Sequence, residues 1–120
     1  MSKILIIEDE ECICGFVDDM LSLSGHTVDC AHTVDAGLLA YFANHYDLLI
    51  TDWNLPDGSG EHIIQSILMQ QSTCKVLIST GGDATAIVEV VEDSYNIKYD
   101  VLLKPFKLAE LLDKVNKLLN

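Results

Sequence analysis

The sequence contains few basic residues. Seven lysines and arginines stand against nineteen aspartates and glutamates, which gives a formal net charge of −12 at pH 7. Binding to nucleic acid depends on cationic contacts to phosphate, so this balance argues against direct nucleic-acid binding. It also means that any site that handles phosphate must take its positive charge from a metal ion or from one particular lysine.

Long apolar runs and cysteine motifs are missing as well. No apolar run approaches the roughly 20 residues that a membrane helix needs, and the N-terminus, MSKILIIEDE, turns acidic too early for a signal peptide. The four cysteines include no CxxC pair, and Cys12 and Cys14 would lie about 200° apart on a helix. We therefore expect a cytoplasmic protein with reduced thiols and no association with membranes.

The length and composition predict one domain. The chain has 120 residues, of which 49% are hydrophobic, so it can bury a core of its own. It shows no internal repeat, no low-complexity segment and no linker. We expect residues 1–120 to form a single domain without an output domain.

Short apolar runs bounded by turn residues alternate with segments of helical period. This alternation predicts an α/β fold in which helices cover both faces of a five-stranded parallel sheet, with right-handed crossovers. Gly25 is expected to end the first helix, and Thr33 and Asp83 to begin the second and fourth. The expected strands are 3–7, 27–31, 47–51, 75–79 and 99–103.

Each of the five helical segments carries a stripe of apolar residues that should face the core. The expected inner residues are Ile13, Phe16, Val17, Met20 and Leu21; Val34, Leu38, Tyr41 and Phe42; Ile63, Ile64, Ile67 and Leu68; Ala84, Ile87, Val88 and Val91; and Leu108, Leu111, Leu112, Val115, Leu118 and Leu119.

Polar residues follow four of the expected strands: Glu8 and Asp9, Asp52, Thr80, and Lys104. The C-terminal ends of parallel strands lie at one edge of a sheet, where ligands bind in open α/β folds. Three carboxylates at this edge would raise one another's pKa, and a hard cation such as Mg²⁺ would relieve the repulsion. One accessible carboxylate could then act as a nucleophile toward a phosphoryl group. A lysine could neutralise the charge of the phosphoryl oxygens, and a hydroxyl could donate a hydrogen bond to one of them.

These strand ends carry a resemblance that covers the whole chain. The segments ILIIEDE (4–10), LLITDWNLPDGSG (48–60), LISTGG (77–82) and LLKPF (102–106) resemble the receiver domain of two-component response regulators. The resemblance implies a doubly wound, flavodoxin-like sheet with strand order 2-1-3-4-5. It also implies a signalling domain that accepts a phosphoryl group and is not a turnover enzyme.

The resemblance assigns a role to each polar residue. Asp52 is implied to be the phosphoacceptor, supplied by a histidine kinase or a histidine phosphotransfer protein. Mg²⁺ is implied to bind Asp9, Asp52 and the backbone carbonyl of Asn54, with Glu8 acting through water. Thr80 and Lys104 are implied to contact the phosphoryl group. The Lys104–Pro105 peptide bond is implied to be cis. A downstream protein target or an effector domain would read the modification.

Two positions depart from the family pattern. The family commonly has an aromatic switch residue three positions before the lysine, where this chain has Val101. Tyr99 should share a strand face with Val101, so we expect a weakened or rerouted switch. Glu8 stands where many relatives have aspartate, which a water-mediated metal contact should tolerate. Gly82 leaves space after Thr80, which predicts a short phosphoryl lifetime.

Other functions stay open at this point. A degenerate receiver that binds partners without phosphorylation is the main alternative, and the chain could be a single-domain regulator or a receiver from a larger protein. A flavodoxin-type flavin carrier would need a phosphate-binding loop where this chain has four acids. An aspartyl phosphatase of the haloacid dehalogenase type would need an aspartate at the position of Asn54.

Overall fold

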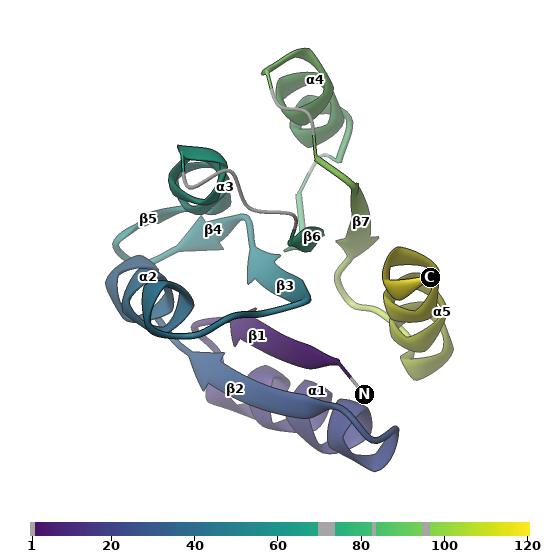
Figure 1. Ribbon diagram of the computed structural model, residues 1–120. Coiled ribbons are helices and arrows are strands. Elements are labelled where there is room, and N and C mark those ends of the chain that lie inside the picture. The colour runs from purple at the N-terminus through teal and green to yellow at the C-terminus, as the bar shows by residue number, and fades with distance from the viewer. Residues whose placement is uncertain (1, 70–73, 83, 95–96) are drawn as a thin grey trace.

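The computed structural model describes residues 2–69, 74–82, 84–94 and 97–120. A parallel sheet runs through the molecule, and helices cover both of its faces (Figure 1). The elements in chain order are β1 (Lys3–Ile7), α1 (Glu11–Leu23), β2 (Thr27–Ala31), α2 (Val34–Ala43), β3 (Leu48–Asp52), β4 (Asn54–Leu55), β5 (Gly58–Ser59), α3 (Gly60–Met69), β6 (Lys75–Thr80), α4 (Ala84–Ser94), β7 (Tyr99–Leu103) and α5 (Leu108–Leu119).

The five long strands form one sheet in the order β2-β1-β3-β6-β7, and all their pairings are parallel. Counted along the chain, this is the order 2-1-3-4-5, so the predicted fold class is confirmed. The chain order reverses between β1 and β3, which are neighbours in the centre of the sheet. Such a reversal opens a crevice at the carboxyl ends of the strands, where α/β proteins place their ligands.

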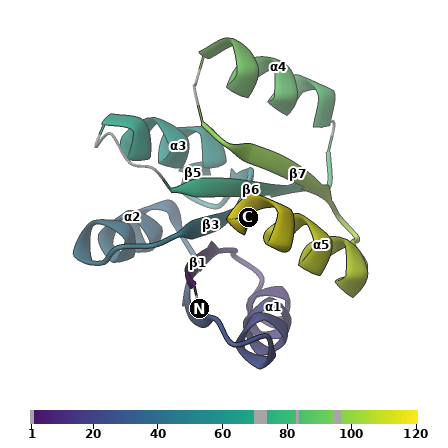
Figure 2. The same cartoon turned by 45° about the vertical axis from the view of Figure 1, so that its right-hand side comes forward.

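The sheet separates two hydrophobic clusters. One face is packed by α1 and α5 and the other by α2, α3 and α4, as Figure 2 shows. The strands contribute alternately to the two clusters: Ile4 and Ile6 of β1 face α1 and α5, whereas Leu5 and Ile7 face the other helices. Tyr99 and Val101 pack together against the second cluster, so their predicted common face is confirmed.

The predicted helix ends agree with the structure where it describes them. Gly25 has a φ of 93°, and its N–H donates to Ser22 while that of His26 donates to Leu21. This is the Schellman arrangement, which needs a residue in the left-handed region. The Thr33 side chain accepts from the N–H of Ala36 and caps α2. Asp83 and the side chain of Leu68 lie outside the described residues.

Three apolar residues that were expected to face the core are exposed. Phe16, Phe42 and Leu108 are 44%, 52% and 36% exposed. Leu108 is the first residue of α5, ahead of the buried stripe Leu111, Val115 and Leu118. The buried stripe of α1 is Cys14, Val17 and Leu21, and that of α2 is Val34, Gly37 and Tyr41. In α2 the reason is a close approach, because a Cβ on Gly37 would collide with the side chain of Ile7. The backbone of α2 can sit this close to β1 only with its glycine inward, which turns Phe42 outward.

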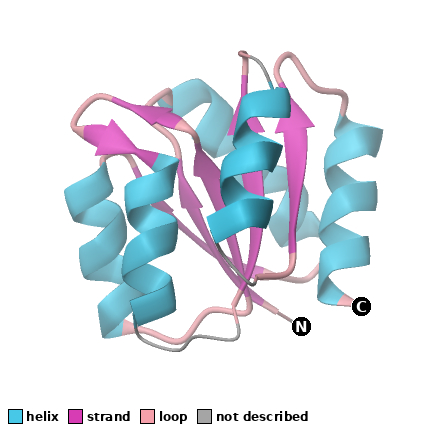
Figure 3. Ribbon diagram, turned by 90° about the horizontal axis from the view of Figure 1, so that it is seen from above, coloured by secondary structure: helices cyan, strands magenta, loops and turns pink. Residues whose placement is uncertain are grey.

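Two features extend beyond the expected pattern. β3 includes Asp52 and β6 includes Thr80, so both residues belong to their strands. The loop after β3 contains a two-residue hairpin, β4 and β5, which the turn-rich sequence did not predict. Figure 3 views the molecule from above, with the carboxyl ends of the long strands at one edge. None of the described helices has the length and apolar character to cross a bilayer.

Candidate functional site

Strand pairing fixes the positions of the two buried acids. Ile7 of β1 pairs with Thr51 of β3, so Glu8 and Asp52 each occupy the next position along neighbouring strands. Alternation places both side chains on the face of α1 and α5. Glu8 is 4% exposed and Asp52 is 7% exposed. The two carboxylates are therefore held side by side by the central strands of the sheet.

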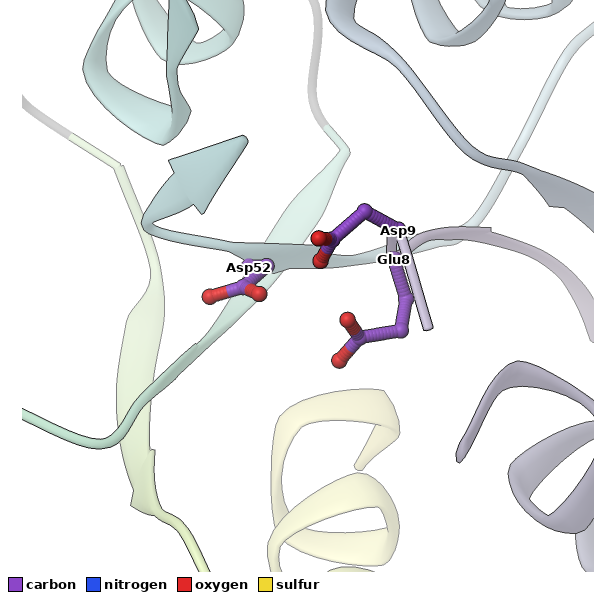
Figure 4. A group of neighbouring side chains, drawn as sticks. All are labelled: Glu8, Asp9 and Asp52. Atoms are coloured by element: carbon purple, nitrogen blue, oxygen red, sulfur yellow. The ribbon is translucent and has the colours of Figure 1, made fainter. Parts of the chain in front are cut away.

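Asp9 completes a cluster of three carboxyl groups. Oxygens of Glu8, Asp9 and Asp52 all lie within 4.8 Å of one another, and Asp9 is the exposed member. Figure 4 shows the three groups turned toward one another, two from the loop after β1 and one from the end of β3. Like charges this close repel each other, so the cluster attracts a counterion.

Lys104 supplies positive charge to this cluster. Its Nζ lies 2.6 Å from Glu8 Oε1 and 3.1 Å from Asp52 Oδ2, and its side chain is 18% exposed. The backbone N–H of Lys104 donates to the Thr80 carbonyl over 2.8 Å, so pairing of β7 with β6 extends to the lysine. The Lys104–Pro105 peptide bond is cis, as the resemblance implied.

Burial and charge shift the pKa values of this pair. Burial raises the pKa of Glu8, and the hydrogen bonds from Lys104 and from the N–H of Glu10 offset this only in part. Burial by itself would lower the pKa of Lys104, but its hydrogen bonds to Glu8 and Asp52 and their charges raise it overall. Lys104 is therefore held in its charged form, whereas burial makes the charged form of Glu8 less favourable than it would be in water.

Backbone donors orient the side chain of Asp52 and the loop that follows β3. The N–H of Asn54 donates to Asp52 Oδ1 over 3.3 Å, and the N–H of Glu10 donates to Glu8 Oε2 over 3.2 Å. The N–H of Gly60 donates to the Trp53 carbonyl over 2.9 Å, and a Cβ on Gly60 would lie 2.9 Å from the Asp52 backbone oxygen. The loop thus closes tightly around Asp52, and only glycine fits at its end.

The oxygen ligands fit a hard divalent cation. The cluster offers three carboxylates and no nitrogen or sulfur, which is the ligand chemistry that Mg²⁺ prefers. The backbone carbonyl of Asn54 belongs to the loop that directly follows Asp52. Because Mg²⁺ usually keeps several waters, a partly exposed cluster suits it better than an enclosed cage.

The structure brings most of the predicted site residues together. Glu8, Asp9, Asp52 and Lys104 converge directly. Thr80 is joined to Lys104 through the backbone; it is 1% exposed, and its Oγ1 accepts from the N–H of Gly82 over 3.0 Å.

Sequence reasoning missed two polar residues at the edges of the site: Ser79, buried beside Asp52, and Asp57, whose carboxylate caps α2. Ser79 could have been noticed as a hydroxyl in the apolar run VLIST. No sequence signal pointed Asp57 toward a helix that precedes it in the chain.

Comparisons with known proteins agree with this geometry. The family model described as the response regulator receiver domain matches residues 4–116. The response regulator ArlR of Staphylococcus haemolyticus is 31% identical over 119 residues, which cover 99% of this chain and 53% of ArlR. ArlR of Staphylococcus aureus strain Mu50 is 32% identical with the same coverage. The chain therefore spans about half the length of these curated relatives.

Solved structures show the same fold. A two-component response regulator from Clostridium difficile aligns with a TM-score of 0.86 and 28% identity, covering 99% of this chain and 96% of the other. The non-phosphorylated HemR receiver domain of Leptospira biflexa aligns at 0.87 and 25%, covering 100% and 95%. The response regulator TrrA of Thermotoga maritima, in complex with Mg²⁺ and BeF, aligns at 0.83 and 27%, covering 98% and 99%.

Proposed function

The chain belongs to the response regulator receiver domain family, and on that premise we propose that Asp52 accepts a phosphoryl group in two-component signalling. The observation that carries this proposal is the convergence of Glu8, Asp9 and Asp52 on Lys104 at one edge of the sheet. Asp52 lies within reach of both the other carboxylates and the lysine; Glu8 shares these contacts, and the match to the receiver family is what selects Asp52 as the proposed acceptor. A carboxylate in that position can act as a nucleophile toward phosphorus.

Mg²⁺ is the proposed metal, held by Asp9, Asp52 and the Asn54 carbonyl, with Glu8 contributing through water. The all-oxygen cluster supports this ligand set, as does the Mg²⁺–BeF complex of TrrA. A bound Mg²⁺ would neutralise charge that develops on phosphoryl oxygens during transfer. The protein's own part is to hold the carboxylates in place through the central strands and the loop after β3.

Lys104 and Thr80 are the proposed partners of the phosphoryl group. Lys104 Nζ already lies 3.1 Å from Asp52, so a phosphoryl group on Asp52 would come within its reach. The lysine would then exchange its bond with Glu8 for one with a phosphoryl oxygen. Thr80 is tied to the lysine by the backbone bond between β6 and β7 and can donate its hydroxyl.

The partners follow from the same chemistry. We propose a histidine kinase or a histidine phosphotransfer protein as the donor, and a protein target or an effector domain as the reader. Residues 1–120 would act as one receiver domain in the cytoplasm, without direct contact with nucleic acid and without turnover as an enzyme. The excess of acids over bases supports the exclusion of nucleic acid.

Intact mass after incubation with acetyl phosphate and Mg²⁺ tests the proposal. The wild type should gain one phosphoryl group, and it should gain none when EDTA replaces Mg²⁺. Asp52→Asn should gain none, because the amide is not a nucleophile of this kind.

Asp57→Asn is the matched control. Asp57 belongs to the same loop as Asp52, but its carboxylate contacts α2 and lies outside the carboxylate cluster. The Asp57→Asn protein should therefore be phosphorylated like the wild type. If the wild type gains no phosphoryl group under these conditions, the chain would be a receiver that binds partners without phosphorylation.

A further inference from the structure

Ser79 carries a buried hydroxyl that has no hydrogen-bond partner within the described part of the chain. The residue is 5% exposed and lies one position before Thr80 on β6. Buried hydroxyls in folded proteins are nearly always paired with protein groups or with ordered water. The hydroxyl of Ser79 therefore calls for a partner, and its surroundings indicate which.

The backbone register places Ser79 beside the acceptor. Asp52 of β3 pairs directly with Ser79 of β6, and Glu8 follows on β1 at the other side of Asp52. Leu77, two residues before Ser79, packs against α1 and α5, so Ser79 points to that face as well. Glu8, Asp52 and Ser79 thus form a row across three neighbouring strands, beneath the layer of the two helices.

A small cavity adjoins this row. Its volume is about 10 Å³, and its polar lining comes from Glu8, Asp52 and Ser79. The remaining lining is apolar and includes Leu102 and Phe106. A cavity of roughly 10 to 15 Å³ holds one water molecule when two to four polar groups face it. This cavity meets both conditions for a single water and is too small for a larger ligand.

The carboxylates have acceptor capacity left for such a water. Glu8 accepts from Lys104 and from the N–H of Glu10, one donor on each oxygen. Asp52 accepts from Lys104 and from the N–H of Asn54, again one on each oxygen. Each carboxylate oxygen has a second lone pair. A water molecule can donate its two O–H groups to the two carboxylates and accept the serine hydroxyl on one of its lone pairs.

We propose that Ser79 is a positioning residue of the acceptor site: its hydroxyl holds one water in this cavity, and the water donates to the carboxylates of Glu8 and Asp52. The water would share the negative charge of Glu8 and so weaken the hold of Glu8 on Lys104. It would also fix the Asp52 carboxylate from below, while Asn54 fixes it from the loop. This role rests on the proposed function, in which Lys104 leaves Glu8 for a phosphoryl oxygen.

The first test is a crystal structure of the wild type at atomic resolution. We expect one water within hydrogen-bond distance of Ser79 Oγ and of at least one oxygen of Glu8 or Asp52. A Ser79 hydroxyl that bonds directly to a carboxylate or to a backbone carbonyl, with no such water, would overturn the proposal. This test does not depend on phosphorylation, so it stands even where the proposed function fails.

The second test compares Ser79→Thr with Ser79→Val. The two variants share size and shape and differ only in the hydroxyl, so any strain from the added carbon is common to both. The initial rate of phosphorylation by acetyl phosphate in saturating Mg²⁺ should be about threefold to tenfold lower for the valine variant, as expected for one lost hydrogen bond. Ser79→Ala, compared with the wild type, provides the same contrast if the larger side chains prevent folding.

Ile78→Val serves as a control for stability alone. Ile78 is buried on the opposite face of β6, so its truncation weakens packing without touching the cavity. Its phosphorylation rate should equal that of the wild type at a temperature where both are folded. Equal rates for the threonine and valine variants would overturn the positioning role. Absence of phosphorylation in the wild type would instead count against the proposed function.

Discussion

Lys104 and Glu8 form an ion pair of 2.6 Å across a separation of 96 residues in the chain. Glu8 follows the first strand and Lys104 follows the last of the long strands, so the pair exists only when the sheet is complete. Asp52 shares the same lysine, whereas Asp9 stands outside this pairing at the exposed side of the cluster. Lys104 therefore pairs with two of the three acids, and the cluster keeps an excess of negative charge.

Replacing Asp9 by asparagine should stabilise the metal-free protein. The change removes one of three like charges at the cost of no buried contact, and a gain of about 0.2 to 1 kcal/mol is expected for an exposed charge. Urea denaturation in EDTA measures it. Asp19→Asn, an exposed acid on α1 away from the cluster, should leave stability unchanged within about 0.5 kcal/mol.

Addition of Mg²⁺ should make the wild type more stable than Asp9→Asn, which reverses their order in EDTA. At a free Mg²⁺ concentration about ten times the Kd, binding to the folded state adds about 1.4 kcal/mol to the wild type. Asp9→Asn should gain little, because it lacks one carboxylate of the cluster. Equal stabilisation of both proteins by Mg²⁺ would contradict the proposed ligand set. Trp53, which follows Asp52, offers a fluorescence readout of the same titration.

Two glycine substitutions should act in opposite directions. Gly15 lies exposed in α1 with open space around its Cα, so Gly15→Ala should stabilise the protein by about 0.5 to 1 kcal/mol. A Cβ on Gly60 would instead meet the backbone of Asp52 and Trp53 at 2.9 and 3.2 Å. Gly60→Ala should cost about 1 to 3 kcal/mol, because the rigid backbone must shift.

The same pair separates stability from function. Displacement of the Asp52 backbone in Gly60→Ala should slow phosphorylation by acetyl phosphate, whereas Gly15→Ala should match the wild type. Denaturation curves and intact mass, measured on the same samples, give both quantities. A Gly60→Ala protein that is as stable and as readily phosphorylated as the wild type would show that the loop relaxes without consequence.

Asp57 should make the stability of α2 depend on pH. The N–H groups of Val34 and Asp35 donate to its two carboxylate oxygens, and these bonds lower the pKa of Asp57 below its usual 3.8. A lowered pKa means that the ionised form stabilises the fold. The contribution is complete above pH 3.8 and is lost as the pH falls through the lower pKa of the folded state.

The measurement is the difference in stability between the wild type and Asp57→Ala. The wild type should be more stable at pH 7 and at pH 5 by the same amount. The difference should shrink at pH 3, because Asp57 is already largely protonated there in the unfolded chain, whose pKa is 3.8, while the folded protein approaches its lower pKa. Asp19→Ala, which removes an exposed acid from α1, is the control for the loss of one negative charge. A difference for Asp57→Ala that grows toward low pH would contradict the capping role.

The four cysteines should react at different rates. Cys12 is exposed, whereas Cys14 and Cys74 are buried. Burial raises the pKa of Cys74 to about 12 and raises that of Cys14 further. Since the thiolate is the reactive form, iodoacetamide at pH 8 should modify Cys12 first and both buried thiols slowly.

Peptide mass spectrometry over time gives the order, and the four rates should converge in urea, where the environments become alike. Cys30 should react more slowly than Cys12 although both are exposed, because burial of its sulfur raises its pKa. Labelling of Cys74 as fast as Cys12 in the folded protein would contradict the packing around the start of β6.

The parallel α/β fold and the acid cluster could be predicted because they depend on rules that act through the chain pattern, whereas the strand order was implied only by the resemblance to the receiver family. Short apolar runs bounded by turn residues predict buried strands. The carboxyl ends of parallel strands lie at one edge of the sheet. Glu8, Asp52 and Lys104 follow from these rules without side-chain packing. The fold class agrees with the prediction for the same reason.

The rest depends on tertiary contacts that no local pattern encodes. The rotation of α2 is decided by the approach of Gly37 to Ile7, so Phe42 could not be placed from helical period alone. The row that joins Ser79 to Asp52 requires the register between β3 and β6. The cap of α2 by Asp57 joins residues 23 positions apart, and the β4–β5 hairpin is too short to leave a periodic signal.

The sheet order has one further consequence for the proposed acceptor site. The acids lie at the ends of β1 and β3, which are interior strands with a partner on each side. Lys104 directly follows β7, which lies at the edge of the sheet and, among the described strands, pairs with β6 alone. Edge elements open locally at lower free energy than the interior of a domain. The carboxylates are thus held by the interior of the sheet, whereas Lys104 lies on the part of the sheet that opens more readily. We therefore expect the backbone amides around Lys104 to exchange hydrogen first, and those of β1 and β3 beside the carboxylates to exchange last.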